Sequence, residues 1–303
     1  MLPFPAFSLE RPNRLDDLLD LAAVPGSRIV AGGTDLLVSL KHRLFQPTPL
    51  VSVAAVRSLR GIRAQDDGVS IGASVSLREV ARHPLVVSKY PALAEACTTI
   101  ATHTIQAMGT IGGNVLLDTR CVYYNQPAGW RDALGGCLKA EGSVCHVARA
   151  GQGCYAAVSG DTVPVLWLMG AELEIRSSGG ERRVPIRELF ADDGRTWLRI
   201  QPGEVLVRIH LPAPGAPIVH RKLRARGSID YPLLLVAVQR EEAGARAVLS
   251  ALGPSPIEVH ADRAEDLPEI AHRAAHPLPT HLWSTKWRKH MVRVEVARAL
   301  RAP

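Results

Sequence analysis

Near its N-terminus the chain runs Ile29-Val30-Ala31-Gly32-Gly33-Thr34-Asp35-Leu36. The apolar run Arg28–Val30 predicts a short strand, and the spacing of apolar residues over Asp35–Leu44 predicts a helix, so the two glycines form a tight turn between them. Glycine lets the backbone approach a bulky anion closely, and the first amides of a helix can donate to phosphate oxygens. This segment therefore predicts an anion-binding turn.

A second glycine-rich segment, Thr110-Ile111-Gly112-Gly113-Asn114, follows a helix predicted over Tyr90–Thr99. Two such turns suit the two phosphates of a dinucleotide. Neither turn matches the G-x-G-x-x-G fingerprint, and the chain has no G-x-x-x-x-G-K-[ST] phosphate loop. The residues alone therefore leave open the alternative that both segments are ordinary tight turns.

Apolar periodicity predicts a mixture of helices and strands over the rest of the chain. The predicted helices lie at 14–24, 77–81, 159–171 and 283–300, and the predicted strands at 51–53, 69–71, 173–175, 183–185 and 205–211. The proline-rich stretch Pro212–Pro217 predicts a domain boundary. Beyond it, Val219–Leu223, Leu233–Val238 and Ala247–Leu252 predict three strands of an antiparallel sheet.

Composition excludes several classes of protein. The 303 residues are 47% apolar and 21% charged, which is ordinary for a globular protein. Apolar runs such as Leu233–Val238 are far shorter than the roughly 18 residues of a membrane span. The first residues show no signal-peptide pattern, which predicts a cytoplasmic protein. The net charge of +7 is spread along the chain, so an anionic dinucleotide or an acidic partner protein explains it better than nucleic acid.

Four of the five cysteines lie within 34 residues, spaced Cys121-x15-Cys137-x7-Cys145-x8-Cys154. In a reducing compartment such clustering favours a metal over disulfides. The lack of a Cys-x2-Cys knuckle disfavours a zinc ribbon, whereas an iron–sulfur cluster can take thiolates from separated points on a loop. Iron–sulfur ligation, zinc ligation and unligated thiols all remain open on spacing alone.

Other residues near these cysteines have expected packing roles. Aromatic residues in the same segment would shield a cluster from water or form a small core: Tyr123, Tyr124, Trp130 and Tyr155. Cys97 lies on a predicted helix outside the group and is expected to be a buried small hydrophobe. His146 is expected to be an ordinary loop histidine.

The glycine segments carry a family resemblance. Ile29–Leu36 resembles the first FAD-binding loop of the xanthine dehydrogenase and carbon monoxide dehydrogenase flavoprotein family, and Thr110–Asn114 resembles its second loop. The resemblance continues nearly end to end in the same order, through Ser159-Gly160-Asp161, Val163–Leu166, Arg221-Lys222-Leu223, Arg226, Ser228, Asp230-Tyr231-Pro232 and Trp287–Met291.

This resemblance implies an α+β protein. A PCMH-type FAD-binding domain would occupy 1–212, as two α/β subdomains of about 1–55 and 56–212. A C-terminal domain of the carbon monoxide dehydrogenase flavoprotein type, with an antiparallel sheet and helices, would occupy 213–303. By resemblance, 29–36 and 110–114 would hold the FAD pyrophosphate, Asp161 would bind towards the ribose, Leu206 would lie beside the cofactor and Lys222 near the flavin.

The cysteine segment, about 116–158, is longer than the connector usual in this family. Its residues are similar to the extra segment of the flavin subunits of the 4-hydroxybenzoyl-CoA reductase family, in Cys121–Gln126, Trp130-Arg131, Ala133-Leu134-Gly135, Cys137-Leu138-Lys139, Gly142, Val144–Val147 and Cys154. That resemblance implies a 4Fe–4S cluster held by Cys121, Cys137, Cys145 and Cys154.

The two resemblances together imply an electron-transfer subunit with no catalytic residue of its own. Ferredoxin would donate electrons to the cluster, and FAD would pass them to a small 2Fe–2S subunit and a molybdopterin-binding large subunit. That large subunit would dehydroxylate 4-hydroxybenzoyl-CoA reductively, in anaerobic degradation of aromatic compounds. The complex would be a dimer of heterotrimers.

Two alternatives remain open. The first is a xanthine, carbon monoxide or aldehyde dehydrogenase-like complex that passes electrons from its molybdenum site to NAD or a quinone. The second is a non-enzymatic iron–sulfur or zinc module that has lost its flavin.

Overall fold

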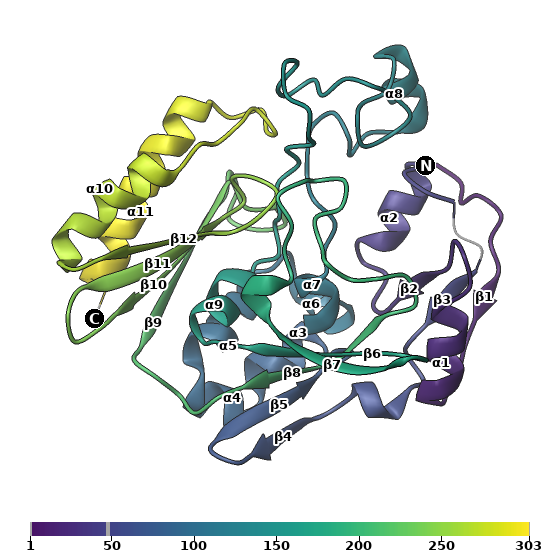
Figure 1. The fold of residues 1–303 in the computed structure, drawn as a ribbon, viewed down its shortest axis with the longest axis horizontal. Helices are drawn as coiled ribbons and strands as arrows, with labels where there is room; N and C mark the ends of the chain where they lie inside the picture. Colours follow the sequence, from purple (N-terminus) through teal and green to yellow (C-terminus); the bar gives the residue numbers. More distant parts are fainter. Residues whose placement is uncertain (1, 47–48, 303) are drawn as a thin grey trace.

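The computed structural model describes residues 2–46 and 49–302, which form three sheets with their helices (Figure 1). The N-terminal sheet is parallel, with strand order β1-β3-β2, and two helices accompany it. Its elements are β1 (Leu9–Glu10), α1 (Leu15–Ala22), β2 (Arg28–Val30), α2 (Leu36–Lys41) and β3 (Leu50–Ser52). Helix α1 buries Leu18 and Leu19 in a core shared with Val205 and Val207 of the central sheet.

The central sheet has five antiparallel strands in the order β4-β5-β8-β6-β7. These strands are β4 (Ile62–Gln65), β5 (Gly68–Gly72), β6 (Glu172–Ser177), β7 (Gly180–Pro185) and β8 (Val205–Leu211), with short 3-10 turns at Arg57–Leu59 and Ile186–Glu188. The largest core of the protein lies between this sheet and the helices beside it, and includes Val69, Ile71 and Ile209.

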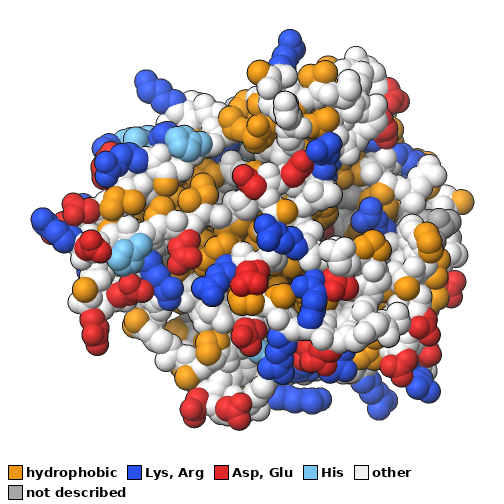
Figure 2. All heavy atoms as spheres, viewed as in Figure 1, with side chains coloured by type: hydrophobic (Ala, Val, Ile, Leu, Met, Phe, Trp, Pro, Cys, Tyr) orange, Lys and Arg blue, Asp and Glu red, His pale blue; other side chains and the backbone are white. Residues whose placement is uncertain are grey.

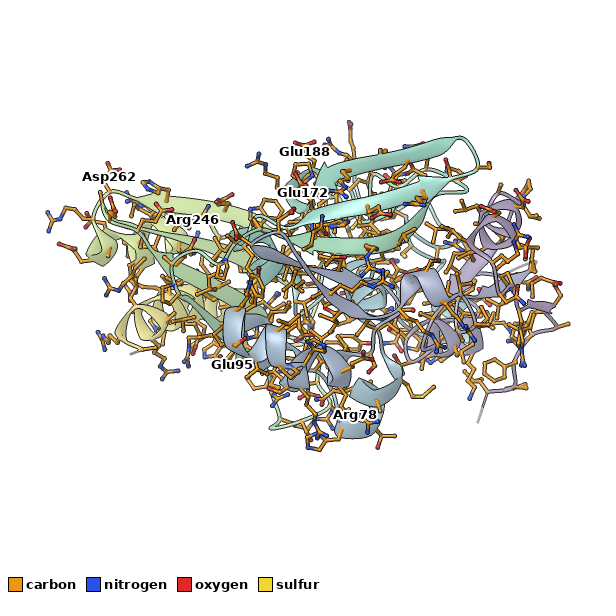
Figure 3. All side chains as sticks on the ribbon, turned by 90° about the horizontal axis from the view of Figure 1, so that it is seen from below. Arg78, Glu95, Glu172, Glu188, Arg246 and Asp262 are labelled. Carbon is orange, nitrogen blue, oxygen red and sulfur yellow. The ribbon has the colours of Figure 1, made fainter. Side chains whose placement is uncertain are left out.

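Helices cover one face of the central sheet, where Arg78 marks α3 and Glu95 marks α5 in Figure 3. They are α3 (Leu77–Arg82), α4 (Pro84–Lys89), α5 (Pro91–Thr98), α6 (His103–Met108), α7 (Ile111–Val115) and α9 (Val163–Leu168). Local sequence explains their starts, because proline occupies the first turn of α4, α5 and α9. The hydroxyl of Ser76 accepts the Glu79 amide at 3.1 Å, which caps α3.

The C-terminal part is an antiparallel sheet of order β12-β11-β10-β9, packed against two helices. Its elements are β9 (Ile218–Leu223), β10 (Leu234–Arg240), β11 (Ala245–Ser250), β12 (Ile257–Ala261), a 3-10 turn at Ala264–Asp266, α10 (Leu267–Ala274) and α11 (Thr285–Arg301). Arg288 of α11 is fully buried and donates to the carbonyls of Leu233, Leu278 and Ala251. The buried guanidinium therefore joins the helix to the sheet.

The predicted α+β class is confirmed, and most predicted elements form at or near their predicted positions. The helix predicted over Asp35–Leu44 ends at Lys41, because Arg43 adopts the left-handed φ of 61°. The second glycine segment is a short helix, α7, rather than an open turn. The sequence prediction also missed strand β12, although Ile257, Val259 and Ala261 alternate with polar residues.

The cysteine segment stands out from the body of the protein, and its only helix in the described residues is α8 (Ala128–Ala133) (Figure 1). Its two ends are joined by paired hydrogen bonds between Arg120 and Ala157, both at 2.8 Å. The amide of Val122 also donates to the Thr280 carbonyl at 2.9 Å, so the segment contacts the loop that leads into α11. None of the helices in the described residues is long and apolar enough to cross a membrane.

Candidate functional site

The first glycine segment presents free amides at the start of α2. The backbone amides of residues 32–36 donate no hydrogen bond to any described residue. Gly33 adopts a φ of +69°, which turns the chain from β2 into the helix. Free amides at a helix start form an anion site, so the geometry agrees with the phosphate-binding role predicted for this segment.

The two glycine segments lie against each other. A Cβ at Gly32 would lie 1.8 Å from the Met108 carbonyl oxygen, and one at Gly109 would lie 3.5 Å from the Thr34 hydroxyl. Gly32 therefore allows the first segment to contact the chain just before the second. The sequence prediction that both segments belong to one site agrees with this placement.

The second segment differs from the first because four of its five amides, those of residues 111–114, already donate hydrogen bonds within the protein. The amides of Ile111 and Gly112 donate to Val75 and Ala73, and the Thr110 hydroxyl accepts from Gly113 at 3.1 Å. The side chain of Asn114 accepts from the amide and hydroxyl of Thr162, at 3.0 and 2.8 Å. The expectation of several free amides at a phosphate thus applies to the first segment, whereas the second offers only the Thr110 amide.

Asp161 and Lys222 form a buried ion pair with a distance of 2.5 Å between Nζ and Oδ1. The Lys222 ammonium also donates to the Thr99 carbonyl at 3.2 Å. Burial raises the pKa of the Asp161 carboxyl, while the Lys222 charge acts in the opposite direction. The two residues that the family resemblance assigned separately to ribose and flavin are therefore neighbours, on the loop before α9 and on β9.

Leu206 is placed on strand β8 and is almost fully buried in the central core. Its side chain packs among apolar residues of the sheet. The structure gives it no polar contact that would mark it as a binding residue.

The four clustered cysteines line one pocket in the protruding segment. Each side chain is buried, with between 7% and 8% exposed. Tyr123, Tyr124, Tyr155, Lys139 and His146 line the same pocket. Trp130 is 41% exposed and lies outside it, so the predicted shielding role is wrong for this residue.

The thiols are close enough to influence one another. Burial raises the pKa of the Cys121 thiol to about 11, and the charges of Cys154 and Cys137 add to this rise. Burial likewise raises the pKa of Cys154, with Cys145 and Cys137 adding to it and Lys139 opposing it. Such thiols stay protonated in water, and a bound metal centre is what would make them thiolates.

The described residues show no ready-made site for a single metal ion. Within the described residues, no group of three or more His, Cys, Asp or Glu side chains is placed to hold one metal ion. A lone tetrahedral ion with sulfur at about 2.3 Å would draw its ligands to within about 4 Å of one another. A four-iron cluster is larger and takes its thiolates from points farther apart.

Cys97 and His146 are the two other residues near the cysteine group for which the sequence analysis stated an expectation. Cys97 is fully buried in the central core on α5, which confirms its expected packing role. His146 lies in a loop, as expected, where it lines the cysteine pocket and its Nε2 lies 2.7 Å from the Gly136 carbonyl oxygen.

Sequence reasoning missed three basic residues that organise the site. Arg120 pairs with Asp35 at the start of α2, and Arg131 is fully buried between the cysteine segment and the end of α2. Lys139 lies in the cysteine pocket. Its position two residues after Cys137 was the available signal. Arg131 is among the residues that carry the resemblance of the cysteine segment, but no role was assigned to it, and nothing in the sequence marks Arg120.

Comparisons with a family model and with known proteins both match this chain to FAD-binding subunits of oxidoreductases. The family model described as the FAD binding domain in molybdopterin dehydrogenase matches residues 5–214. The aldehyde oxidoreductase FAD-binding subunit of Escherichia coli (strain K12) is 31% identical over 273 residues, which cover 86% of each chain. The carbon monoxide dehydrogenase medium chain of Afipia carboxidovorans is 27% identical, over 82% of this chain and 73% of the relative.

A solved structure shows the same fold. It is a carbon monoxide dehydrogenase from Hydrogenophaga pseudoflava that lacks the Mo-pyranopterin moiety of the molybdenum cofactor. The TM-score is 0.79 at 21% identity, covering 99% of this chain and 98% of that one. The predicted fold, with its FAD-binding and C-terminal parts, is therefore confirmed.

Proposed function

We propose that this chain, which belongs to the family of the FAD binding domain in molybdopterin dehydrogenase, is the electron-transfer subunit of a molybdenum-type oxidoreductase. In this proposal it carries FAD and a 4Fe–4S cluster. The observation that carries the second cofactor is the pocket lined by Cys121, Cys137, Cys145 and Cys154. FAD supplies the ability to exchange electrons singly or in pairs. The chain supplies the binding groups and the electrostatic surroundings.

The FAD site is supported by the free amides of residues 32–36 beside the second glycine segment. Residues 29–36 would hold the pyrophosphate, with 110–114 forming the wall against which they lie. Asp161 would accept from the ribose hydroxyls. Lys222, held in place by Asp161, would set a positive charge near the flavin, which stabilises negative charge on the reduced ring.

The cluster site is supported by four buried thiols from well-separated points of one segment. Their separation along the sequence suits a cluster, which can take thiolates from separated points of a loop. Tyr123, Tyr124 and Tyr155 line the same pocket, where their rings would shield a bound cluster from water. The cysteines would bind as thiolates and hold the cluster within the segment that protrudes from the FAD-binding part. This arrangement gives electrons an entry or exit point that is separate from the flavin.

The partners and the reaction are proposed from the family resemblance of the sequence. A molybdopterin-binding large subunit and a small 2Fe–2S subunit would complete the complex, as a dimer of heterotrimers. The resemblance of the cysteine segment supports a 4-hydroxybenzoyl-CoA reductase, with ferredoxin as electron donor. Electrons would then run from the cluster to FAD and on to the substrate site of the large subunit.

The second candidate is an aldehyde-oxidising complex, in which electrons run outwards through FAD. The 31% identity with the aldehyde oxidoreductase FAD-binding subunit of Escherichia coli favours it. Both candidates use the same residues of this chain. They differ in the substrate and in the direction of electron flow.

The cofactor part of the proposal is tested on the purified chain. The dithionite-reduced protein is expected to show a 4Fe–4S electron paramagnetic resonance signal, and denaturation is expected to release FAD. Cys145→Ser should lose the signal and keep FAD, while the matched Cys97→Ala variant should keep both. Retention of the full signal in Cys145→Ser, or its loss only in Cys97→Ala, would contradict the assigned ligands.

The reaction is tested on the assembled complex by stopped-flow absorbance of the flavin. A reductase predicts that 4-hydroxybenzoyl-CoA reoxidises the flavin reduced by ferredoxin, and that aldehydes leave the oxidised flavin unchanged. An aldehyde-oxidising complex predicts the reverse pair of results. Rapid flavin reduction by NADH with none by ferredoxin would also favour the outward direction.

A further inference from the structure

Lys139 places a buried positive charge in the cysteine pocket. Its side chain is 6% exposed, and it lines the pocket together with all four clustered cysteines. The ammonium lies 4.6 Å from the centroid of the Tyr124 ring and 4.4 Å from that of Trp197. A lysine in such surroundings is rare, since an ammonium is strongly hydrated and burial costs it that hydration.

Asp118 and Thr119 hold this ammonium in one place. The Lys139 Nζ lies 2.5 Å from the Asp118 carboxylate and 2.5 Å from the Thr119 hydroxyl. The same carboxylate accepts from the Tyr124 hydroxyl at 2.9 Å, and Tyr124 is itself a wall of the pocket. Asp118 and Thr119 therefore hold the ammonium of a residue that lines the pocket together with the four cysteines.

Lys139 and Asp118 carry opposite charges and lie at different distances from the interior of the pocket. Lys139 is one of the pocket-lining residues, whereas Asp118 lies behind it and does not line the pocket. Lys139 lines the same pocket as the four thiols, so its buried positive charge lies at the wall of the pocket that they share. In surroundings with few water molecules, charges act over longer distances than in bulk solvent.

We propose that Lys139 is a positioning residue that sets the reduction potential of the cluster held by the four cysteines, and that Asp118 moderates its effect. The inference rests on the proposed function. One-electron reduction adds a negative charge at the pocket, so a fixed positive charge stabilises the reduced state and raises the potential. Net charge and hydrogen bonding around the sulfurs are general determinants of such potentials.

The test is a redox titration of the holoprotein with dithionite, followed by electron paramagnetic resonance of the cluster. Lys139→Met is expected to shift the midpoint potential to more negative values. Asp118→Asn is expected to shift it the opposite way, because it removes the opposing charge. Lys139→Arg keeps the charge and should stay close to the wild-type potential.

The opposite signs separate an electrostatic role from a structural one. A purely structural role would change the cluster content of both variants without moving their potentials in opposite directions. If Lys139→Met fails to hold the cluster, the other two variants still test the electrostatic role. Asp118→Asn should shift the potential to more positive values, and Lys139→Arg should keep it close to that of the wild type.

Unchanged potentials, or shifts of the same sign in Lys139→Met and Asp118→Asn, would overturn the role of Lys139 and leave the proposed function intact. A wild-type chain without iron would instead refute the proposed cluster, and with it this role.

Discussion

At the scale of single residues, Gly32 has no room for a side chain. A Cβ there would lie 1.8 Å from the Met108 carbonyl oxygen, which is main chain and cannot rotate away. We predict that Gly32→Ala destabilises the protein by about 1–3 kcal/mol, as overpacking does, and lowers the FAD content. Urea unfolding and the ratio of FAD to protein measure both effects.

The matched control is Gly129→Ala on α8, where a new Cβ would meet no atom within 4 Å. Alanine is favoured over glycine in a helix, so this variant should be as stable as the wild type or about 1 kcal/mol more stable. Equal stability and equal FAD content in Gly32→Ala would show that the two glycine segments do not need their close contact.

The burial of His220 leads us to predict that the free energy of unfolding depends on pH. Its two ring nitrogens make no hydrogen bond to any described residue, and burial lowers its pKa from 6.5 to about 4, with the charges of Lys222 and Arg221 adding to this. Between about pH 6.5 and 4 the unfolded chain takes up a proton that the folded chain does not. The free energy of unfolding should therefore decrease as the pH falls through this window.

We predict that His220→Gln removes about 3 kcal/mol of this decrease, since each pKa unit corresponds to about 1.4 kcal/mol. Urea unfolding at a series of pH values from 7 to 4 measures it. His281, whose pKa burial also lowers to about 4, should leave part of the dependence in place. His290→Gln, at an exposed position of α11, is the control, and an equal change in both variants would contradict the role of His220.

At the scale of elements, Arg131 joins the cysteine segment to the end of α2. Its guanidinium donates to the carbonyls of His42, Arg43 and Gln126, at 3.0, 3.0 and 2.6 Å. We predict that Arg131→Met destabilises the protein by at least about 2 kcal/mol, because the buried carbonyls lose their donor. Chemical denaturation provides the measurement. Arg149→Met, which changes an exposed arginine of the same segment, should have little effect.

The elements also show what the sequence can and cannot predict. Strands β2 and β8 form where their apolar runs lie, since period and burial agree there. The early end of α2 was not predictable, because its apolar spacing continues to Leu44 while Arg43 adopts a left-handed conformation. The conversion of the second glycine segment into α7 depends on the Thr110 cap and on partners at Val75 and Ala73, which are distant in sequence.

At the scale of the whole molecule, three parts of the chain meet at Asp35. Its carboxylate accepts from the Arg120 guanidinium at the base of the cysteine segment and from the Tyr231 hydroxyl of the C-terminal part, the latter at 2.7 Å. The Arg120 guanidinium also lies 4.3 Å from the centroid of the Tyr231 ring. The side chain of Asp35 thus joins the parts, while its predicted role at FAD stays a prediction that concerns its backbone amide.

We predict that Arg120→Met loosens this junction. Hydrogen–deuterium exchange should increase in residues 224–233 and at the start of α2, because both lose a shared partner. Tyr231→Phe keeps the ring and loses only the hydroxyl, so its increase should be smaller. Unchanged exchange in Arg120→Met, with Arg149→Met as reference, would show that the parts are held together elsewhere.

Charge is distributed over the whole surface, as Figure 2 shows for one face, where basic and acidic side chains are interspersed. The net charge of +7 was therefore a poor guide to the site. The clustering of four cysteines in one segment was a better guide, because the fold brings all four to one pocket. The order of the domains and the boundary near 212 remain predictions that rest on the family resemblance.

The most direct measurement is the amount of iron, acid-labile sulfide and FAD in the wild-type chain after anaerobic reconstitution. Four thiols around one cluster beside a single flavin predict about four irons and four sulfides for each FAD. Fewer than about three irons for each FAD would contradict the cluster, and would leave the chain as a flavin subunit with four unligated thiols.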